Sequence, residues 1–222
     1  MPEFDYQWRS LLDPGLQFTE DRVNEFLSHV QLPPDYFKGK LCLDAGCGSG
    51  RFTYAMRQLG AIVDSLDVSS EAVRRCEETN PYARVCDIRT LPPSRLYDFV
   101  FCWGVLHHLE NPREGFEHVV SQVRYGGVLH VMIYHEEVTA QSLYTTFRRD
   151  WHKLTNTQKL LRAQAISTDL KQSLHGWWDA LNPVFAWGFS PDDVRGWFEA
   201  EGFDYIQLVH RQHIQMRGRK AR

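Results

Sequence analysis

Residues 41–52 constrain the fold more than any other stretch of the chain. An apolar run there ends at Asp44, and three glycines follow it: Gly46, Gly48 and Gly50. Short apolar runs bounded by turn signals are typical of buried parallel strands, and glycine lets the backbone turn tightly beside a ligand. The next residues, 51–59, predict a helix whose first N–H groups face the loop. Together they predict the first nucleotide-binding turn of a doubly wound α/β sheet.

The loop itself bears on which nucleotide is bound. A dinucleotide-binding loop has the pattern Gly-x-Gly-x-x-Gly, and the sixth position here is Arg51. The carboxylate of Asp44 would lie close to a pyrophosphate, whereas it suits a ligand with a cationic amino-acid end. The loop therefore favours such a ligand, and a nicotinamide dinucleotide is the weaker alternative.

The segment Leu43-Asp-Ala-Gly-Cys-Gly-Ser-Gly50 resembles the first motif of class I S-adenosylmethionine-dependent methyltransferases, of the small-molecule, type 11 kind. The resemblance covers roughly residues 39–209. It implies a Rossmann-like α/β fold with a seven-stranded, mostly parallel sheet, an N-terminal helical lid and a helical insertion after the fifth strand. It also implies S-adenosylmethionine as cofactor and S-adenosylhomocysteine as product. The implied loop contacts are Asp44, Gly46, Cys47, Gly48, Gly50 and Arg51.

Acidic residues follow the next two predicted strands. Asp67 ends the second strand, 21 residues after Gly46, and this spacing predicts a carboxylate that accepts the hydroxyl groups of a ribose. Both candidate cofactors carry that ribose. By resemblance, Asp87 accepts the adenine amine and Ile88 donates its backbone N–H to the ring. The other predicted cofactor contacts are Val68, Trp103 and Gly104.

Two adjacent histidines, His107 and His108, follow the fourth predicted strand, 97–102. Methyl transfer from a sulfonium is an in-line displacement, so the protein has to align the acceptor and remove its proton. A histidine can act as that base. Both are candidate catalytic residues, and packing at a helix entry is the alternative role for either.

Aromatic and polar residues outside the cofactor motifs are candidate acceptor contacts. Aromatic residues near the N-terminus belong to the predicted lid, residues after the fifth strand face the ligand crevice, and residues 175–183 could form an aromatic-walled pocket. The predicted set is Tyr6, Trp8, His107, Tyr134, His135, Trp178, Asp179 and Asn182.

Composition limits the remaining possibilities. The hydrophobic fraction of 43% in 222 residues predicts one folded domain with a sizeable core. The net charge of -3 gives no general basis for nucleic-acid binding, and neither Asp/Asn-Pro-Pro-Tyr nor Pro-Cys, which mark DNA base methylation, follows the fourth strand. The five cysteines fit reduced thiols rather than a metal site. With no leader and no long apolar run, we expect a cytoplasmic protein that does not insert in a membrane; the sequence leaves monomer and homodimer open.

The expected single domain divides into five parts. These are a lid at 1–38, a cofactor-binding core at 39–136, a helical insert forming the acceptor region at 137–189, a last helix with C-terminal strands at 190–216, and a basic tail at 217–222.

The sequence thus predicts an S-adenosylmethionine-dependent methyltransferase that acts on an oxygen, nitrogen or carbon atom of a small molecule. Two alternatives remain: a non-catalytic cofactor-binding or RNA-associated protein with the same fold, and, less favoured, a nicotinamide-dependent oxidoreductase.

Overall fold

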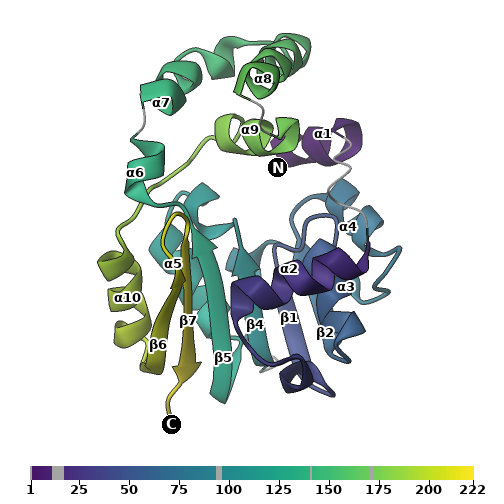
Figure 1. The fold of residues 1–222 in the computed structure, drawn as a ribbon, viewed down its shortest axis with the longest axis vertical. Coiled ribbons are helices and arrows are strands. Elements are labelled where there is room, and N and C mark those ends of the chain that lie inside the picture. The colour runs from purple at the N-terminus through teal and green to yellow at the C-terminus, as the bar shows by residue number, and fades with distance from the viewer. Residues whose placement is uncertain (1, 12–17, 94–96, 141, 171–172) are drawn as a thin grey trace.

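A seven-stranded sheet forms the centre of the molecule (Figure 1). The computed structural model describes residues 2–11, 18–93, 97–140, 142–170 and 173–222. The strands are β1 (Leu41–Ala45), β2 (Ile62–Asp67), β3 (Ala83–Val85), β4 (Tyr97–Trp103), β5 (Val123–Ile133), β6 (Phe203–His210) and β7 (Ile214–Lys220). Their order is β3-β2-β1-β4-β5-β7-β6. Strands β1 to β5 pair in parallel, while β7 is antiparallel to both of its neighbours. The carboxyl ends of the five parallel strands therefore meet at one edge.

Helices cover both faces of this sheet and its carboxyl edge. The helices are α1 (Pro2–Ser10), α2 (Glu20–Val30), α3 (Arg51–Gln58), α4 (Ser70–Cys76), α5 (Pro112–Val120), α6 (Glu136–Thr139), α7 (Ser142–Arg148), α8 (Asn156–Leu170), α9 (Leu174–Leu181) and α10 (Pro191–Ala200). Single 3-10 turns lie at Pro34–Phe37, Ile88–Thr90, Leu106–His108 and Trp151–Lys153.

Apolar clusters on the two sheet faces hold the layers together. On one face Phe26 of α2 contacts Phe52 of α3 and Phe101 of β4. On the other face Phe116 of α5 packs against Phe198 of α10. All five rings are almost completely buried. Because both faces are covered, the parallel strands carry nearly continuous apolar runs, as their sequences predicted.

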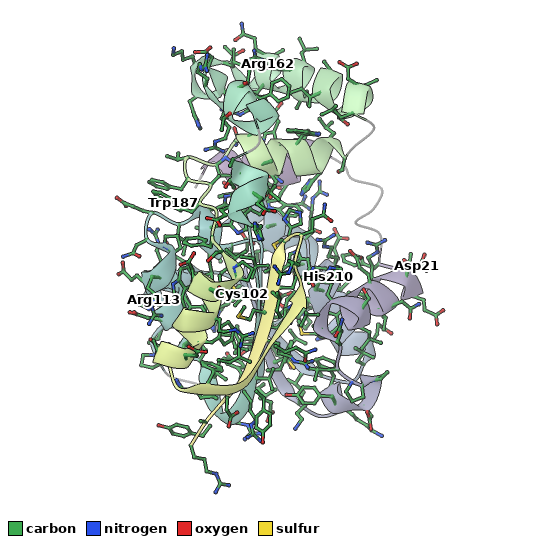
Figure 2. The ribbon with its side chains drawn as sticks, turned by 60° about the vertical axis from the view of Figure 1, so that its left-hand side comes forward. Asp21, Cys102, Arg113, Arg162, Trp187 and His210 are labelled. Atoms are coloured by element: carbon green, nitrogen blue, oxygen red, sulfur yellow. The ribbon has the colours of Figure 1, made fainter. Side chains whose placement is uncertain are left out.

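Helix α1 and the inserted helices α6 to α9 lie over the carboxyl edge of the sheet (Figure 1). The insert has a small core of its own, in which Trp151 and Trp178 are fully buried against Leu11, which follows α1. Figure 2 shows this layer from another side, with Arg162 of α8 at its outer end and Cys102 inside the sheet. We refer to α1 and α6 to α9 together as the roof. Two of its helices, α1 and α9, come from distant parts of the chain and contact each other.

The basic residues at the end of the chain do not form a tail, contrary to the sequence prediction. Arg217 and Arg219 belong to β7, where Arg217 Nη1 donates to the carbonyl of Gln31 at 2.9 Å and Arg219 pairs with Asp204 at 2.9 Å. The C-terminal strands were expected to end at residue 216, but the last of them, β7, runs from Ile214 to Lys220. No helix in the described part of the chain combines the length and apolar character needed to cross a membrane.

Candidate active site

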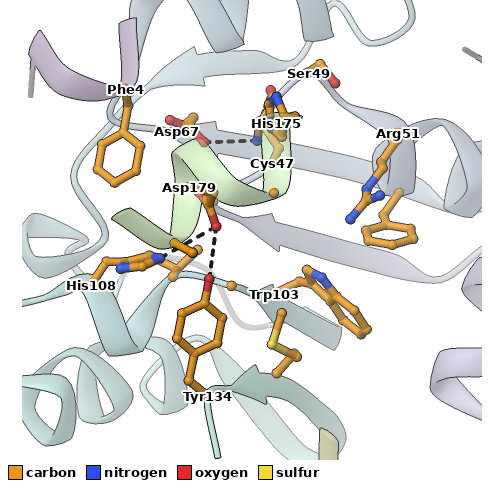
Figure 3. Close-up of a pocket in the computed structure, with 18 of the residues that line it drawn as sticks. Phe4, Cys47, Ser49, Arg51, Asp67, Trp103, His108, Tyr134, His175 and Asp179 are labelled. Atoms are coloured by element: carbon orange, nitrogen blue, oxygen red, sulfur yellow. Dashed lines mark hydrogen bonds and ion pairs between the residues drawn. The ribbon is translucent and has the colours of Figure 1, made fainter. Parts of the chain in front are cut away.

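A cavity of about 890 Å³ lies between the carboxyl edge of the sheet and the roof (Figure 3). Its walls come from the glycine loop, the ends of β2, β4 and β5, the turn between β6 and β7, and the roof helices α1 and α9. This volume lies in the upper part of the range of about 300–1,000 Å³ for small-molecule sites. One continuous space therefore joins the glycine loop to the inserted helices.

The glycine loop has the backbone that its sequence predicted. Gly46 has a φ of +90°, and a Cβ placed there would lie 2.1 Å from Val105 Cγ2. Gly50 caps α3 with a φ of +91° and leaves no room for a Cβ beside Cys76. Gly46, Cys47 and Gly48 line the cavity, whereas Gly50 serves the packing behind it.

Asp67 lies at the end of β2 with both carboxylate oxygens in hydrogen bonds. Oδ2 accepts from the backbone N–H of Gly48 and Oδ1 from that of Ser69, each at 2.9 Å. Burial raises the pKa of Asp67, and these N–H groups act in the opposite direction. Because each carboxylate oxygen can accept two hydrogen bonds, capacity for ligand hydroxyl groups remains. Its neighbour Val68 also lines the cavity.

Asp87 and Ile88 line the cavity one strand further along. Both oxygens of Asp87 accept hydrogen bonds from the guanidinium of Arg89, which holds the pKa of that carboxyl below its usual value. The residues predicted after β4, Trp103 and Gly104, also lie on the wall.

Asp44 is almost completely buried at the end of β1, and it lines the cavity. Its Oδ2 accepts a hydrogen bond from Thr53 Oγ1 at 2.6 Å. Burial raises its pKa to about 7, and the Thr53 hydrogen bond only partly opposes this shift. A cation in the cavity would stabilise the ionised form of this carboxyl.

Ser49 and Arg51 complete the loop; Ser49 lies inside the predicted motif at 43–50, although it was not among the individual contacts predicted. The Ser49 side chain is buried, lines the cavity and has no hydrogen-bond partner for its hydroxyl. A buried polar atom of this kind is normally satisfied by a ligand or water. Arg51 lines the same region and lies 3.6 Å from Glu25. A hydroxyl, a guanidinium and the N-terminus of α3 suit a ligand carboxylate.

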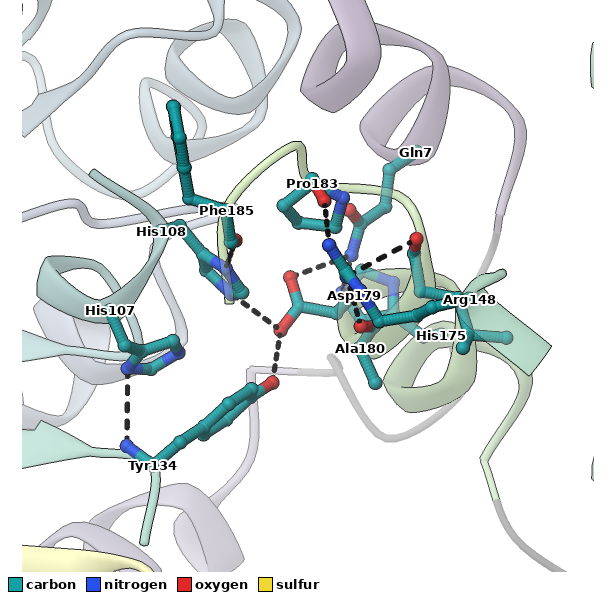
Figure 4. A network of polar contacts seen from close by, with 11 residues as sticks. Gln7, His107, His108, Tyr134, Arg148, His175, Asp179, Ala180, Pro183 and Phe185 are labelled. Atoms are coloured by element: carbon teal, nitrogen blue, oxygen red, sulfur yellow. Dashed lines mark hydrogen bonds and ion pairs between the residues drawn. The ribbon is translucent and has the colours of Figure 1, made fainter. Parts of the chain in front are cut away.

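The far half of the cavity contains a polar network around Asp179 of α9 (Figure 4). Tyr134 donates its hydroxyl to Asp179 Oδ2 at 3.2 Å, and Gln7 Nε2 approaches Oδ1 at 3.5 Å. His108 Nε2 lies 3.7 Å from Oδ2. Burial raises the pKa of Asp179, but the interactions with His108, His175 and Gln7 outweigh it and hold that pKa below the usual value.

The two candidate catalytic histidines occupy different environments. His107 is fully buried away from the cavity wall, its Nδ1 accepts from the backbone N–H of Tyr134 at 3.3 Å, and burial lowers its pKa well below the usual value. His107 therefore packs beneath Tyr134, with ring centroids 3.7 Å apart, and does not face a ligand. His108 does line the cavity.

Besides His107, four predicted acceptor contacts lie outside the cavity wall. Trp178 is fully buried in the insert, and Tyr6 stacks on it with centroids 5.0 Å apart. Asn182 accepts from Lys159 Nζ at 2.9 Å, and His135 caps α6. These side chains are used in packing and capping, which corrects their predicted placement. Trp8, Tyr134 and Asp179 do face the cavity.

Several wall residues were missing from the predicted site. They come from α1, the end of β5, α9 and the turn after β6, and they are Phe4, Met132, His175, Gln212 and His213. Trp177 belongs to the aromatic-walled pocket expected at 175–183, and it also lines the cavity. No local pattern marks these positions, because only the packing of the roof brings them together. Within the described ranges no group of three or more histidine, cysteine, aspartate or glutamate side chains could hold a metal ion.

Residues 18–208 match the family model of a methyltransferase domain. The chain belongs to this family. Membership confirms the resemblance predicted from the glycine loop and the predicted enzyme class, a methyltransferase. The sheet order and the match to solved structures confirm the predicted seven-stranded fold.

Individual relatives differ in what they act on. The mitochondrial ubiquinone biosynthesis O-methyltransferase of Schizosaccharomyces pombe is 28% identical over 67% of this chain and 59% of its own length. The tRNA U34 carboxymethyltransferase of Shewanella frigidimarina is 32% identical over 57% of this chain and 37% of its own length. The chain thus spans well under two thirds of either relative.

A solved structure with a similar fold is magnesium protoporphyrin IX methyltransferase from Synechocystis with bound S-adenosylhomocysteine. It is 17% identical, has a TM-score of 0.58, and the match covers 97% of this chain and 93% of that one. This likeness concerns the fold.

Proposed function

We propose that this chain transfers a methyl group from S-adenosylmethionine to an oxygen, nitrogen or carbon atom of a small molecule. The observation that carries the proposal is the single cavity that joins the glycine loop to Asp179 and His108 beneath the roof. S-adenosylmethionine supplies an electrophilic methyl group on a sulfonium. The protein has to hold this donor and a second molecule in line, which accounts for much of the rate enhancement in such reactions.

The residues along the first half of the cavity have the chemistry that the donor requires. Ser49, Arg51 and the start of α3 hold the methionine carboxylate, and Asp44 pairs with its ammonium group. Asp67 accepts the ribose hydroxyls. Asp87 and the backbone N–H of Ile88 bind the adenine edge. The unpartnered Ser49 hydroxyl and the buried Asp44 carboxyl support this assignment, because both lack a compensating group that such a ligand provides.

The position of the roof helices over the cavity favours a small acceptor over a folded RNA. Helices α1 and α9 close the far half of the cavity, and Trp8 of α1 lies directly over Gly48 of the loop. Three of the basic residues expected to form a free tail, Arg217, Arg219 and Lys220, belong to β7. Because some relatives modify tRNA, the experiment has to distinguish binding of RNA from binding of a small molecule.

Calorimetric titration with S-adenosylmethionine and S-adenosylhomocysteine tests the donor. We expect micromolar binding that Asp67→Ala weakens about tenfold or more, because buried hydrogen bonds are lost. Asp204→Ala is the matched control: this carboxylate is exposed and pairs with Arg219 on the opposite side of the fold from the loop. No binding of either compound by a folded protein would refute the proposal, and tight binding of tRNA with no small-molecule methylation would refute the acceptor class.

A further inference from the structure

The acceptor half of the cavity combines aromatic walls with one carboxylate. Phe4 and Tyr134 contribute rings to this wall and Asp179 supplies the carboxylate (Figure 3). Trp177 contributes a third ring. Among the described wall residues, Arg51 is the only lysine or arginine, and it lies at the glycine loop beside Glu25. The acceptor half therefore suits a flat, apolar molecule and offers no strong cation to an acid or a phosphate.

Asp179 is held in place from several sides. Tyr134 and Gln7 donate to its two oxygens from β5 and α1. Its helix is fixed at the C-terminal end by Arg148, whose guanidinium donates to the carbonyls of Ala180, Pro183 and Val184 at 2.8–3.0 Å (Figure 4). Cations bonded to the last carbonyls of a helix stabilise that end. The carboxylate is thus positioned before any acceptor binds.

His108 offers a site for a proton next to this carboxylate. Its Nδ1 lies 2.9 Å from the carbonyl oxygen of Phe185, an acceptor, so Nδ1 carries the hydrogen. Its Nε2 is buried, lacks a hydrogen-bond partner, and stands 3.7 Å from Asp179 Oδ2, which is longer than a hydrogen bond. With the hydrogen on Nδ1, Nε2 holds the lone pair of the ring and is the nitrogen that can accept a proton beside Asp179.

We propose that the acceptor is a compact aromatic or heteroaromatic molecule that presents an O–H or N–H group to Asp179 and His108. The inference rests on the proposed function and narrows its acceptor. Asp179 orients the donor hydrogen, and the proton passes to His108 Nε2. The electron pair left on the acceptor oxygen or nitrogen forms the new bond to the methyl carbon, while the pair of the broken carbon–sulfur bond stays on sulfur. Aromatic carboxylates and phosphates are poor ligands, because Asp179 repels them.

Binding to the protein saturated with S-adenosylhomocysteine tests this without turnover. The probes are catechol, benzylamine, benzoate and phenyl phosphate, measured by calorimetry or saturation-transfer NMR. We expect catechol or benzylamine to bind at least tenfold more tightly than the two anions, and Asp179→Asn to remove most of that difference. Asp204→Asn is the matched control, and retained S-adenosylhomocysteine binding shows that each variant is folded.

Proton transfer can be followed separately with 4-nitrocatechol, because the ionised form of this probe absorbs in the visible range. Bound to the protein, it should ionise at a lower pH than in water, and His108→Gln should abolish that shift while leaving the probe bound within about threefold.

Three outcomes would overturn the acceptor class: tighter binding of benzoate or phenyl phosphate, no effect of Asp179→Asn, or normal S-adenosylhomocysteine binding with none of the four probes bound. The last would leave the methyltransferase proposal intact. Failure to bind S-adenosylhomocysteine would refute that broader proposal instead.

Discussion

His130 makes the stability of this protein depend on pH in a way that one substitution should reveal. The ring lies in β5, fully buried and nearly parallel to the neighbouring rings of Phe101 and Trp103, with interplanar angles of 17° and 6°. Neither ring nitrogen has a hydrogen-bond partner. Burial, with the charge of Arg217 as a smaller cause, lowers its pKa from 6.5 to about 3.

The sign follows from proton binding in the two states. Between pH 6.5 and 3 the unfolded chain protonates this histidine while the native state does not, so stability is lost as the pH falls through this range. One proton changes the free energy of unfolding by about 1.36 kcal/mol per pH unit. At pH 5 the native state is therefore about 2 kcal/mol less stable than at pH 7.5 on account of His130 alone.

The assay is urea unfolding of the wild type and His130→Phe at pH 5 and pH 7.5, followed by tryptophan fluorescence. Phenylalanine keeps the stack but has no titratable group, so its loss of stability between the two pH values should be smaller by about 2 kcal/mol. His210→Phe, at an exposed position at the end of β6 (Figure 2), should follow the wild type. A variant at position 130 with the wild-type pH dependence would refute the reasoning.

Three further perturbations test other parts of the structure. Because the pKa of Asp44 is about 7 and we propose that its ionised form pairs with the ammonium group of S-adenosylmethionine, affinity for this compound should fall about tenfold per pH unit below pH 7. Calorimetry should show Asp44→Asn to be weak at every pH, and an equal pH response in both proteins would contradict the role. Gly46 has a positive φ and no room for a Cβ, so Gly46→Ala should lower the free energy of unfolding, measured in urea, by about 2 kcal/mol or more. Gly196 lies in α10 with open space around it, so Gly196→Ala should stabilise the protein by up to about 1 kcal/mol. Similar values for the two variants would argue against crowding at Gly46. Arg148→Gln should lower the local stability of α9 by about 2 kcal/mol, which would appear as faster hydrogen exchange in α9 but not in β4. Arg149 is exposed, so Arg149→Gln should change the exchange of neither element. Unchanged exchange in both variants would contradict the role of Arg148 in holding the end of α9.

The cofactor half could be predicted because its signals are local. Asp67 follows a strand at a fixed distance from the glycine loop, and parallel strands bring their carboxyl ends to one edge. The order of residues along the chain therefore already determines which side chains meet there. The glycines report backbone conformations that other residues rarely adopt, so their placement needs no knowledge of the rest of the fold.

The acceptor half could not be predicted in the same way. Trp178 and Asp179 are neighbours on α9, and successive helical residues point about 100° apart. One therefore faces the insert core and the other the cavity, and only the orientation of the whole helix decides which. In the same way, the contact of Gln7 with Asp179 depends on where α1 packs.

The basic end of the chain did carry a readable signal. Ile214, Met216 and Gly218 alternate with polar residues, and the apolar side chains of this set are buried. That period of two is typical of a strand with one covered face. Charge content alone gave the wrong interpretation, because arginine side chains on the other face of a strand remain able to reach carbonyl and carboxylate partners.

Helices α1 and α9 meet above the cavity, but only α9 lies within the match to the family model. Gln7 and Trp8 lie before residue 18, where the match to the family model begins, yet Trp8 lines the cavity and Gln7 contacts Asp179 on the cavity wall. Under the proposed function, the donor-binding loop lies within the family match while part of the acceptor wall lies outside it. Grafting α1 from another family member onto this chain should redirect which molecule is methylated while the affinity for the methyl donor stays within a few-fold.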